Sequence, residues 1–234
     1  MSALSQKLKN HFYRNEEHPY VLFEDAIRAL VRPNDTILDA GCGRSAPVLR
    51  KFKNIAGSLI GVDLVDPRDV GDDIEYYNAD LRSIPIPSSS VDVVISRSVF
   101  EHLTDPDGVY KEMYRVLKPG GQLVFLTANA WDYGTVMAKI IPNKFHSKIV
   151  RYVEGRAEED TFPTAFKTNS KSAVKKLSAA HGFEVARFQY LGQYPSYFMF
   201  NGPLFLLGIC YERLTRLDSL GFLRGWILVT LEKK

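Results

Sequence analysis

Residues 37–45 read ILDAGCGRS, and this stretch decides the expected fold. Together with Thr36 it begins as a short apolar, β-branched run, which is typical of a buried parallel strand. Gly41 and Gly43 then allow a tight turn in which the backbone can approach a ligand closely. A helix is expected from Ala46, with its N-terminal N–H groups directed at that ligand. Strand, glycine turn and helix together predict a nucleotide-type site at the carboxyl end of a strand.

The residues around the two glycines indicate which ligand the turn holds. A dinucleotide-binding loop needs the pattern G-x-G-x-x-G, but Ala46 stands where the third glycine would be. Asp39 lies two residues before Gly41, and its carboxylate would repel a pyrophosphate but suit an ammonium group. The helix N-terminus could still hold a carboxylate. A ligand with an ammonium, a carboxylate and a ribose, such as S-adenosylmethionine, therefore fits this turn better than one with phosphates.

Two further acids follow later strands in the same way. Residues 58–62 read as a second strand that ends in Asp63, where an acid is expected to accept hydrogen bonds from ribose hydroxyls. Residues 74–77 read as a third strand, and Asp80 behind it could accept a hydrogen bond from an adenine amino group. These positions predict a nucleoside bound at the ends of the strands.

The rest of the chain supplies more strands and helices at suitable spacing. Helices are expected over 3–13, 19–31, 105–118 and 171–181, and strands over 91–96, 122–127, 183–190 and 226–231. Strands that alternate with helices in this way predict a parallel sheet covered by helices on both faces.

Five short motifs, in this order, resemble the class I S-adenosylmethionine-dependent methyltransferases, in their small-molecule, type 11-like branch. They are residues 38–43, 61–63, 78–80, 99–103 and 116–121. The resemblance implies a Rossmann-like α/β fold: a doubly wound sheet of seven strands, mostly parallel with an antiparallel edge strand. N-terminal helices and an apolar helical insertion between the sixth and seventh strands are expected beside it.

The resemblance also implies S-adenosylmethionine as the cofactor and a set of residues that bind it. In chain order these are Asp39, Ala40, Gly41, Gly43, Asp63, Leu64, Asp80, Leu81, Ser96 and Arg97. Asp39 and the two glycines would line the methionine part, and Asp63 would bind the ribose. Asp80 with Leu81 would bind the adenine, and Ser96 with Arg97 would border the sulfonium.

We expect one methyltransferase domain over residues 1–234. Its expected parts are an N-terminal helical cap (1–32), a cofactor-binding core (33–130), a lid segment (131–169) and a C-terminal part (170–234).

An apolar insertion over 194–223 interrupts the C-terminal part, where a connection between edge strands is usually short. Its leucines and tyrosines recur at three- and four-residue spacing, which predicts a helix over 203–216 with an apolar stripe. The stripe residues are Leu204, Leu207, Tyr211 and Leu214. Such a surface is expected to pack on the domain itself, on a second subunit in a homodimer, on an apolar acceptor, or on a membrane surface through 197–214.

Two histidines are candidates for a general base. His146 follows the fifth strand, on the side of the sheet where ligands bind, and His102 follows the fourth strand beside Glu101. The alternative for His146 is a surface residue of a loop. The alternative for Glu101 and His102 is a structural role in the loop over the cofactor.

Four residues are candidates for contact with the methyl acceptor: Tyr13, Tyr133, Arg156 and Tyr197. Arg156 belongs to a charged run that could bind an anionic acceptor or could simply be solvated. Tyr13, like Tyr20, could cover the cofactor or could pack the N-terminal helices onto the core.

Composition restricts the class of partner. A net charge of +3 with scattered lysines and arginines does not favour nucleic acid as the ligand. Two cysteines, Cys42 and Cys210, predict neither a disulfide framework nor a metal site, which fits the cytoplasm. Residues 1–20 lack the apolar core of a signal peptide, and no stretch is long enough to predict a transmembrane helix.

Together these features predict an S-adenosylmethionine-dependent methyltransferase that acts on a small or lipid-like acceptor, at oxygen. One alternative is a non-catalytic cofactor-binding scaffold or regulatory partner with the same fold. The other is a nicotinamide oxidoreductase, against which Asp39 and the missing third glycine speak.

Overall fold

The computed structural model describes residues 1–140 and 163–234. The chain divides into two compact units. Unit 1 comprises Met1–Pro19, Ala128–Pro163 and Tyr190–Ile227. Unit 2 comprises Tyr20–Thr127, Thr164–Gln189 and Leu228–Lys234. The predicted N-terminal cap is thus divided between the units after Pro19.

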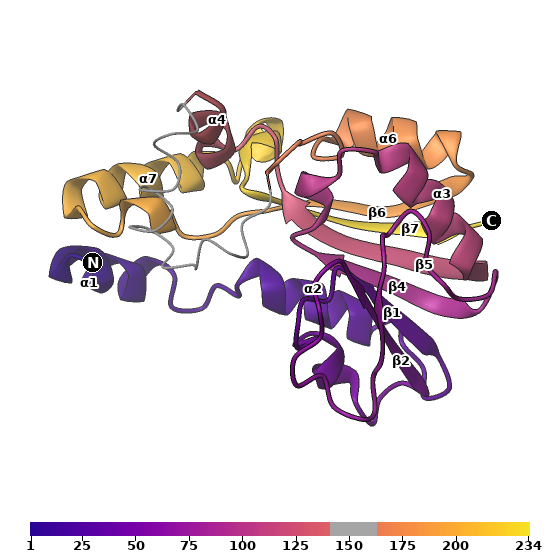
Figure 1. Cartoon of the computed structure of the whole chain (residues 1–234). Helices are drawn as coiled ribbons and strands as arrows, with labels where there is room; N and C mark the ends of the chain where they lie inside the picture. The colour runs from indigo at the N-terminus through magenta and orange to yellow at the C-terminus, as the bar shows by residue number, and fades with distance from the viewer. Residues whose placement is uncertain (141–162) are drawn as a thin grey trace. The chain divides into compact units, whose positions relative to one another are not determined.

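A seven-stranded sheet forms the centre of unit 2, with the strand order β3-β2-β1-β4-β5-β7-β6 (Figure 1). Its strands are β1 (Thr36–Ala40), β2 (Ser58–Asp63), β3 (Glu75–Asn78), β4 (Val91–Arg97), β5 (Leu117–Ala128), β6 (Phe183–Leu191) and β7 (Trp226–Lys233). The pairs β3-β2, β2-β1, β1-β4 and β4-β5 are parallel. Strand β7 lies between β5 and β6 and runs opposite to β5 (Figure 1). The predicted fold class is confirmed.

Strand β1 is a buried interior strand of the sheet, between β2 and β4. Its residue Leu38 pairs with Ile60 of β2 on one side and with Val94 of β4 on the other. All three side chains are buried, as expected for parallel strands covered on both faces. This register aligns the carboxyl ends of β1 and β2, so that Ala40 pairs with Val62 immediately before Gly41 and Asp63.

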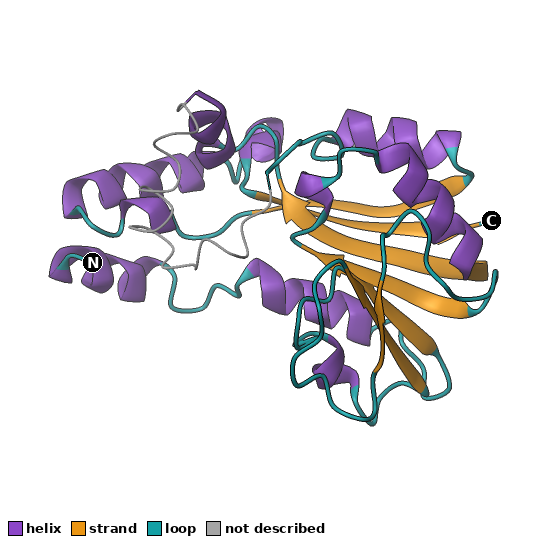
Figure 2. Ribbon diagram, viewed as in Figure 1, coloured by secondary structure: helices purple, strands orange, loops and turns teal. Residues whose placement is uncertain are grey.

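Helices cover both faces of the sheet. Helices α3 (Pro106–Val116) and α6 (Lys171–Ala180) lie on one face and α2 (Pro19–Arg28) on the other (Figure 2). Ser170 caps α6 by accepting a hydrogen bond from the backbone N–H of Ala173 at 3.2 Å. Asp105 caps α3 in the same way, through the N–H of Gly108 at 3.1 Å.

The prediction of an α-helix from Ala46 is wrong. The chain forms turns there and then a short 3-10 helix, η1 (Leu49–Phe52). Ala46 has a φ of 45°, in the left-handed region, and Pro47 follows it. A residue before proline is disfavoured in the right-handed helical conformation, so an α-helix cannot begin at Ala46. The glycine turn is therefore followed by turns and a 3-10 helix rather than by the N-terminus of an α-helix.

Unit 1 contains α1 (Ala3–Phe12), α4 (Tyr133–Ile140), η4 (Ser196–Phe198), α7 (Gly202–Leu214) and η5 (Asp218–Leu223). Helix α1 lies beside α7 (Figure 1). Asn201 caps α7 by accepting a hydrogen bond from the N–H of Leu204 at 3.1 Å. The predicted helix in the insertion is confirmed.

The face of α7 that packs inward differs from the predicted stripe. Phe205, Ile209 and Glu212 are buried, and the first two join the core of unit 1 with Tyr13 and Met199. The predicted stripe leucines are exposed instead: Leu204 by 39%, Leu207 by 65% and Leu214 by 56%. The helix is apolar on both sides from Pro203 to Ile209, so hydrophobic periodicity could not decide which side packs. None of the described helices is long and apolar enough to cross a membrane.

Candidate functional site

The glycine turn after β1 has a backbone that only glycine adopts readily. Gly41 has a φ of 85° and Gly43 a φ of 70°. A Cβ on Gly41 would lie 2.2 Å from Cγ2 of Val99, whereas a Cβ on Gly43 would meet no atom within 4 Å. The first glycine is therefore required by packing within the protein, and the second leaves open space beside the turn.

Asp63, at the end of β2, is held against this turn. One carboxylate oxygen accepts a hydrogen bond from the N–H of Gly43 at 2.7 Å, and the other accepts one from the N–H of Val65 at 3.2 Å. Two backbone donors fix the orientation of the side chain before any ligand binds. Each carboxylate oxygen retains further capacity to accept, which suits the hydroxyls of a ribose.

Asp39 is buried, and one of its two carboxylate oxygens has no hydrogen-bond partner among the described residues. Only 2% of the residue is exposed, and its Oδ2 atom accepts no hydrogen bond from the described residues. The pKa of Asp39 is raised to about 7, because burial raises it more than the charge of Arg97 lowers it, and the charge of Asp63 adds a smaller rise. An orphaned buried oxygen carries a desolvation cost that a cationic ligand group would relieve. The residue therefore fits the ammonium group of S-adenosylmethionine.

The two residues at the end of β4 are both engaged within unit 2. The hydroxyl of Ser96 donates a hydrogen bond to the carbonyl of Ala40 at 2.7 Å, which ties β4 to the end of β1. The guanidinium of Arg97 lies 4.4 Å from the centre of the Tyr20 ring and 3.6 Å from a carboxylate oxygen of Glu24. Tyr20, which belongs to helix α2, thus contacts Arg97, one of the predicted cofactor-binding residues.

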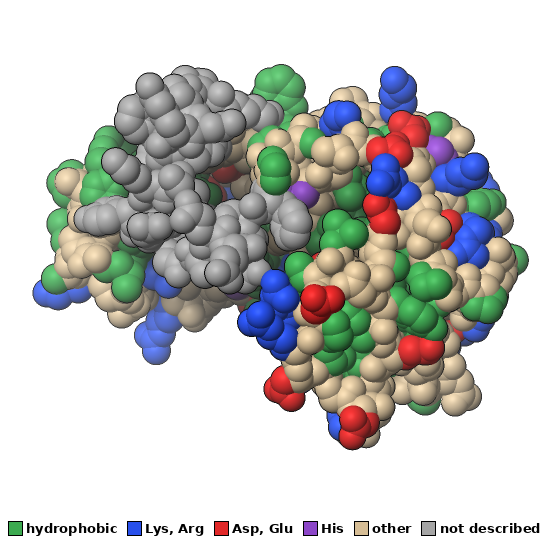
Figure 3. All heavy atoms as spheres, in the orientation of Figure 1, with side chains coloured by type: hydrophobic (Ala, Val, Ile, Leu, Met, Phe, Trp, Pro, Cys, Tyr) green, Lys and Arg blue, Asp and Glu red, His purple; other side chains and the backbone are tan. Residues whose placement is uncertain are grey.

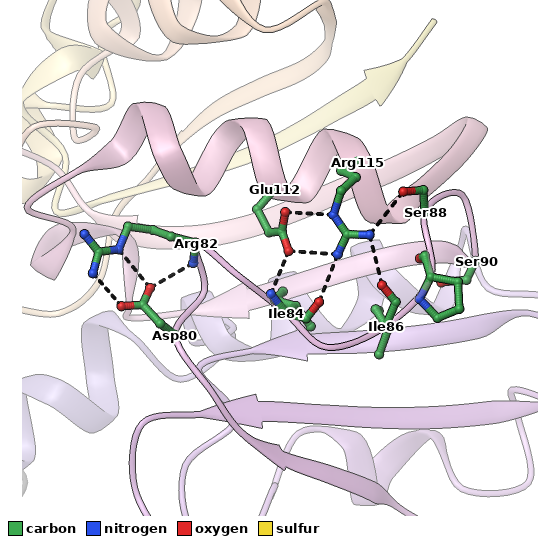
Figure 4. Close-up of polar contacts among 9 residues, drawn as sticks. Asp80, Arg82, Ile84, Ile86, Ser88, Ser90, Glu112 and Arg115 are labelled. Atoms are coloured by element: carbon green, nitrogen blue, oxygen red, sulfur yellow. Dashed lines mark hydrogen bonds and ion pairs between the residues drawn. The ribbon is translucent and has the colours of Figure 1, made fainter.

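Asp80 is paired with its neighbour Arg82 (Figure 4). Its carboxylate accepts hydrogen bonds from the backbone N–H, Nε and NH2 groups of Arg82 at 2.8, 3.0 and 2.7 Å. These contacts lower the pKa of Asp80. Leu81 is buried, whereas Leu64 is 59% exposed. The assignment of Asp80 and Leu81 to an adenine stays a prediction.

A second ionic group in Figure 4 was not anticipated. Glu112 and Arg115, three residues apart on α3, form two hydrogen bonds of 2.8 Å. Glu112 also accepts from the N–H of Ile84 at 2.6 Å, and Arg115 donates to the carbonyls of Ile84 and Ile86, each at 2.9 Å. The pair fastens the segment after Asp80 to α3. The i,i+3 spacing of Glu112 and Arg115 was the available sequence signal.

Glu101 has structural partners on three segments. Its carboxylate accepts a hydrogen bond from the hydroxyl of Thr127, which in turn accepts one from the side chain of Asn169 at 2.8 Å. Its carbonyl accepts from the N–H of Ala165 at 2.7 Å. These contacts agree with the structural interpretation of Glu101. His102 ends the short helix η2 (Phe100–His102) and is half-buried.

The predicted acceptor residues that are described lie in unit 1. The Tyr133 ring stacks on Phe198 at 5.5 Å between ring centres and makes an edge contact with Tyr197 at 6.4 Å. Tyr13 is buried in the core of the unit and lies 6.1 Å from Tyr194, which supports its packing interpretation. His146 and Arg156 lie outside the described residues.

A polar cavity of about 330 Å³ was also not anticipated from the sequence. Its lining residues are Glu16, Gly192, Glu212, Thr215, Arg216 and Arg224, all within unit 1. Burial, together with the charge of nearby Asp132, raises the pKa of Glu212 to about 8. The sequence could not predict that Glu212 is buried, because a single acid at the end of an apolar helix looks the same as an acid on the surface.

Comparisons with known proteins agree with this fold and site. Residues 38–125 match the methyltransferase domain family. A probable S-adenosylmethionine-dependent methyltransferase of Mycolicibacterium smegmatis is 34% identical over 166 residues, which cover 65% of this chain and 62% of that protein. A sterol 24-C-methyltransferase of Pneumocystis carinii is 30% identical over 107 residues, which cover 41% of this chain and 28% of that protein. The chain thus spans less than two thirds of either relative.

Among solved structures, a putative methyltransferase of Bacillus halodurans has a TM-score of 0.58 at 18% identity. The superposition covers 92% of this chain and 99% of that one, and it shows a shared fold. The family match and the shared fold support a class I methyltransferase domain. Residues 38–125 belong to the methyltransferase domain family of the type 11 kind, with S-adenosylmethionine as the cofactor, as predicted.

Proposed function

We propose that this chain transfers the methyl group of S-adenosylmethionine to a small or lipid-like acceptor, at oxygen. The observation that carries the proposal is the orphaned carboxyl oxygen of Asp39 beside the glycine turn. In a site without ligand this oxygen is buried at a cost, and the ammonium of the methyl donor would supply the missing partner.

The residues of unit 2 divide the work of binding. Asp39 would accept the ammonium, Asp63 would accept the ribose hydroxyls, and the open space at Gly43 would admit the ligand beside the backbone. When bound, S-adenosylmethionine supplies a methyl group on an electrophilic sulfonium. The protein then needs only to hold the donor in line with the acceptor and to exclude water.

Two observations support an apolar acceptor. The sterol 24-C-methyltransferase among the relatives is named for a lipid acceptor. Unit 1 contains many aromatic and aliphatic side chains, and the ring of Tyr133 contacts those of Phe198 and Tyr211. The same relative methylates carbon, so carbon is the second candidate for the acceptor atom. The general-base role of His146 belongs to this proposal only if the acceptor is a hydroxyl.

The test is a screen with S-adenosylmethionine that carries a deuterated methyl group. The purified protein is incubated with aqueous and organic extracts of cells, and products that are heavier by one deuterated methyl group are identified by mass spectrometry. A labelled product from the organic extract, with the methyl on oxygen, is expected. A label on carbon would show that the acceptor atom is carbon rather than oxygen. A protein that binds the donor but labels no product in either extract supports the scaffold alternative and overturns the proposed activity.

A further inference from the structure

Helix α7 exposes an apolar face that the core of unit 1 leaves uncovered. We name it the α7 face, and it comprises Leu204, Leu206, Leu207, Cys210 and Leu214. Leu204, Leu207, Cys210 and Leu214 repeat at three- and four-residue spacing, and Leu206 lies four residues before Cys210, so the set faces one side of the helix. Their leucines are 39 to 65% exposed, and Cys210 is exposed as well. A surface helix normally presents polar side chains outward, so this face calls for a partner.

The apolar surface continues onto the neighbouring helix α1. The N–H of Ser2 donates a hydrogen bond to the carbonyl of Met199 at 2.8 Å, which fixes the start of α1 beside the start of α7. Leu4 packs closely on Gly202: a Cβ on Gly202 would lie 2.6 Å from a side-chain carbon of Leu4. Met1 and Leu4 are nevertheless 92 and 51% exposed, so they extend the α7 face across both helices.

The charged side chains on α1, which borders this surface, are basic. Residues 1–15 contain Lys7, Lys9 and Arg14 and no acid, and residues 188–211 contain no charged residue. The next acid along the chain, Glu16, is paired with Arg216 and lies 3.7 Å from Arg213. In Figure 3 hydrophobic side chains cover much of the visible surface around α1 and α7, with basic side chains along its lower edge.

We infer that the α7 face docks unit 1 on the surface of a membrane that contains anionic lipids. An apolar helical face buried at the level of the lipid headgroups, bordered by lysines and arginines, is the general requirement for such binding. The face carries leucines but no tryptophan or arginine at its centre, whereas protein–protein hot spots favour tryptophan, tyrosine and arginine over leucine. Charge complementarity and composition therefore favour a lipid surface over a second copy of the chain.

A lipid-like acceptor would give this surface its purpose, and in that respect the inference rests on the proposed function. The two are tested separately, because membrane docking is measured without methyl donor or acceptor. Failure to bind vesicles would overturn the inference and leave methyl transfer to a small acceptor intact.

Cys210 allows a test on the otherwise unaltered chain. It lies within the α7 face and is exposed, whereas the other cysteine, Cys42, is buried. A polarity-sensitive fluorophore attached to Cys210 is expected to shift to shorter wavelength when vesicles of phosphatidylcholine and phosphatidylserine are added. Pure phosphatidylcholine vesicles are expected to give a weaker response. As a control the fluorophore is moved to α6 in the variant Cys210→Ser/Ser172→Cys, where no shift is expected.

Two pairs of variants separate the apolar and the charged contributions. Leu207→Gln/Leu214→Gln is expected to reduce vesicle binding about tenfold or more, whereas Val21→Gln on α2 leaves it unchanged. Lys7→Glu/Arg14→Glu is expected to weaken binding to anionic vesicles, whereas Lys175→Glu/Lys176→Glu on α6 does not. Circular dichroism verifies the fold of each variant, and the labelled chain tests the inference even if a variant fails to fold.

Three outcomes would overturn the inference. The first is the absence of a shift at Cys210 with anionic vesicles, and the second is an equal shift with the fluorophore on α6. The third is a dimer, seen by analytical ultracentrifugation, that the leucine substitutions abolish while vesicles do not bind. In that case the α7 face joins two copies of the chain.

Discussion

The carboxylate of Asp63 and the backbone N–H of Gly43 are joined by a hydrogen bond of 2.7 Å. This contact links the end of β2 to the turn that follows β1, so the two parts of the expected cofactor site form one rigid element. Asp63 is therefore both a predicted ligand of the ribose and a support of the glycine turn. Changes at either residue should affect cofactor binding through the other.

Substitution of Asp63 by alanine is expected to weaken the binding of S-adenosylmethionine by about 1–3 kcal/mol, because ligand hydroxyls and the turn both lose a charged acceptor. Asp63→Asn retains one acceptor oxygen and should lose less. Isothermal titration calorimetry measures both affinities, with circular dichroism as the control for folding. Unchanged affinity in a folded alanine variant would show that Asp63 does not contact the cofactor.

Gly41→Ala is expected to destabilise the protein strongly, because the added Cβ would lie 2.2 Å from Val99 and the φ of 85° is unfavourable for alanine. The left-handed conformation costs about 1–2 kcal/mol, and overpacking adds about 1–3 kcal/mol. In Gly43→Ala, at a φ of 70°, the added Cβ meets no neighbouring atom. This variant should therefore lose only the free energy of the left-handed conformation.

The pair is compared by urea unfolding, together with the double variant Gly41→Ala/Val99→Ala and with Val99→Ala alone. Removal of the Val99 side chain should recover part of the stability lost in Gly41→Ala. Equal stability of the two single glycine variants would contradict the packing argument.

Asp39 should make stability depend on pH. Burial raises its pKa in the folded protein from 3.8 to about 7, so the folded state binds the proton more tightly than the unfolded chain does. The free energy of unfolding from this group is therefore highest below pH 3.8 and falls as the pH rises toward 7. Asp39→Asn removes the titration, so its unfolding free energy should fall less between pH 5 and pH 8, as measured in urea. Parallel pH profiles for the two proteins would rule out a raised pKa.

The same residue should couple cofactor binding to proton release. An ammonium group next to Asp39 favours the ionised carboxylate. At a pH below the pKa of Asp39, which is about 7, cofactor binding should therefore release a proton, and the affinity for the cofactor should rise with pH. Calorimetry at pH 6 in two buffers with different ionisation enthalpies measures the number of protons released. The release should be absent in Asp39→Asn. Identical heats in both buffers for the unaltered protein would exclude Asp39 as the ammonium acceptor.

Arg115→Met is expected to destabilise the protein by about 2–4 kcal/mol, because it leaves Glu112 and the carbonyls of Ile84 and Ile86 without their donor. The matched control is Arg82→Met, which breaks the exposed pair with Asp80 and should cost about 1 kcal/mol or less. Thermal unfolding compares the two variants. A similar loss in both would mean that the Glu112–Arg115 group does not fasten the segment after Asp80.

Much of this fold could be predicted because the decisive signals are local. Apolar runs that end in Asp39 and Asp63 identified the central strands, and the glycines between them identified the turn. Backbone conformation at Gly41 depends on the residue itself and on its immediate surroundings. The parallel register then brings the ends of β1 and β2 together without further information from side chains.

The rest depended on which of several compatible contacts forms. Pro47 prevents a helix at Ala46, a local effect that the expectation of a helix overlooked. The packing side of α7 could not be inferred, because apolar residues surround the helix axis from Pro203 to Ile209. The lack of a hydrogen-bond partner for one carboxylate oxygen of Asp39, among the described residues, depends on its three-dimensional neighbours, which no sequence spacing specifies.

We expect S-adenosylmethionine to bind at the turn bounded by Asp39, Gly43 and Asp63. Calorimetric titration of the purified protein with S-adenosylmethionine and, separately, with NAD is the decisive measurement. Saturable binding of one S-adenosylmethionine per chain, weakened in Asp63→Ala, is expected, with no heat of binding from NAD. Saturable binding of NAD, or no binding of S-adenosylmethionine by a folded protein, would contradict this expectation.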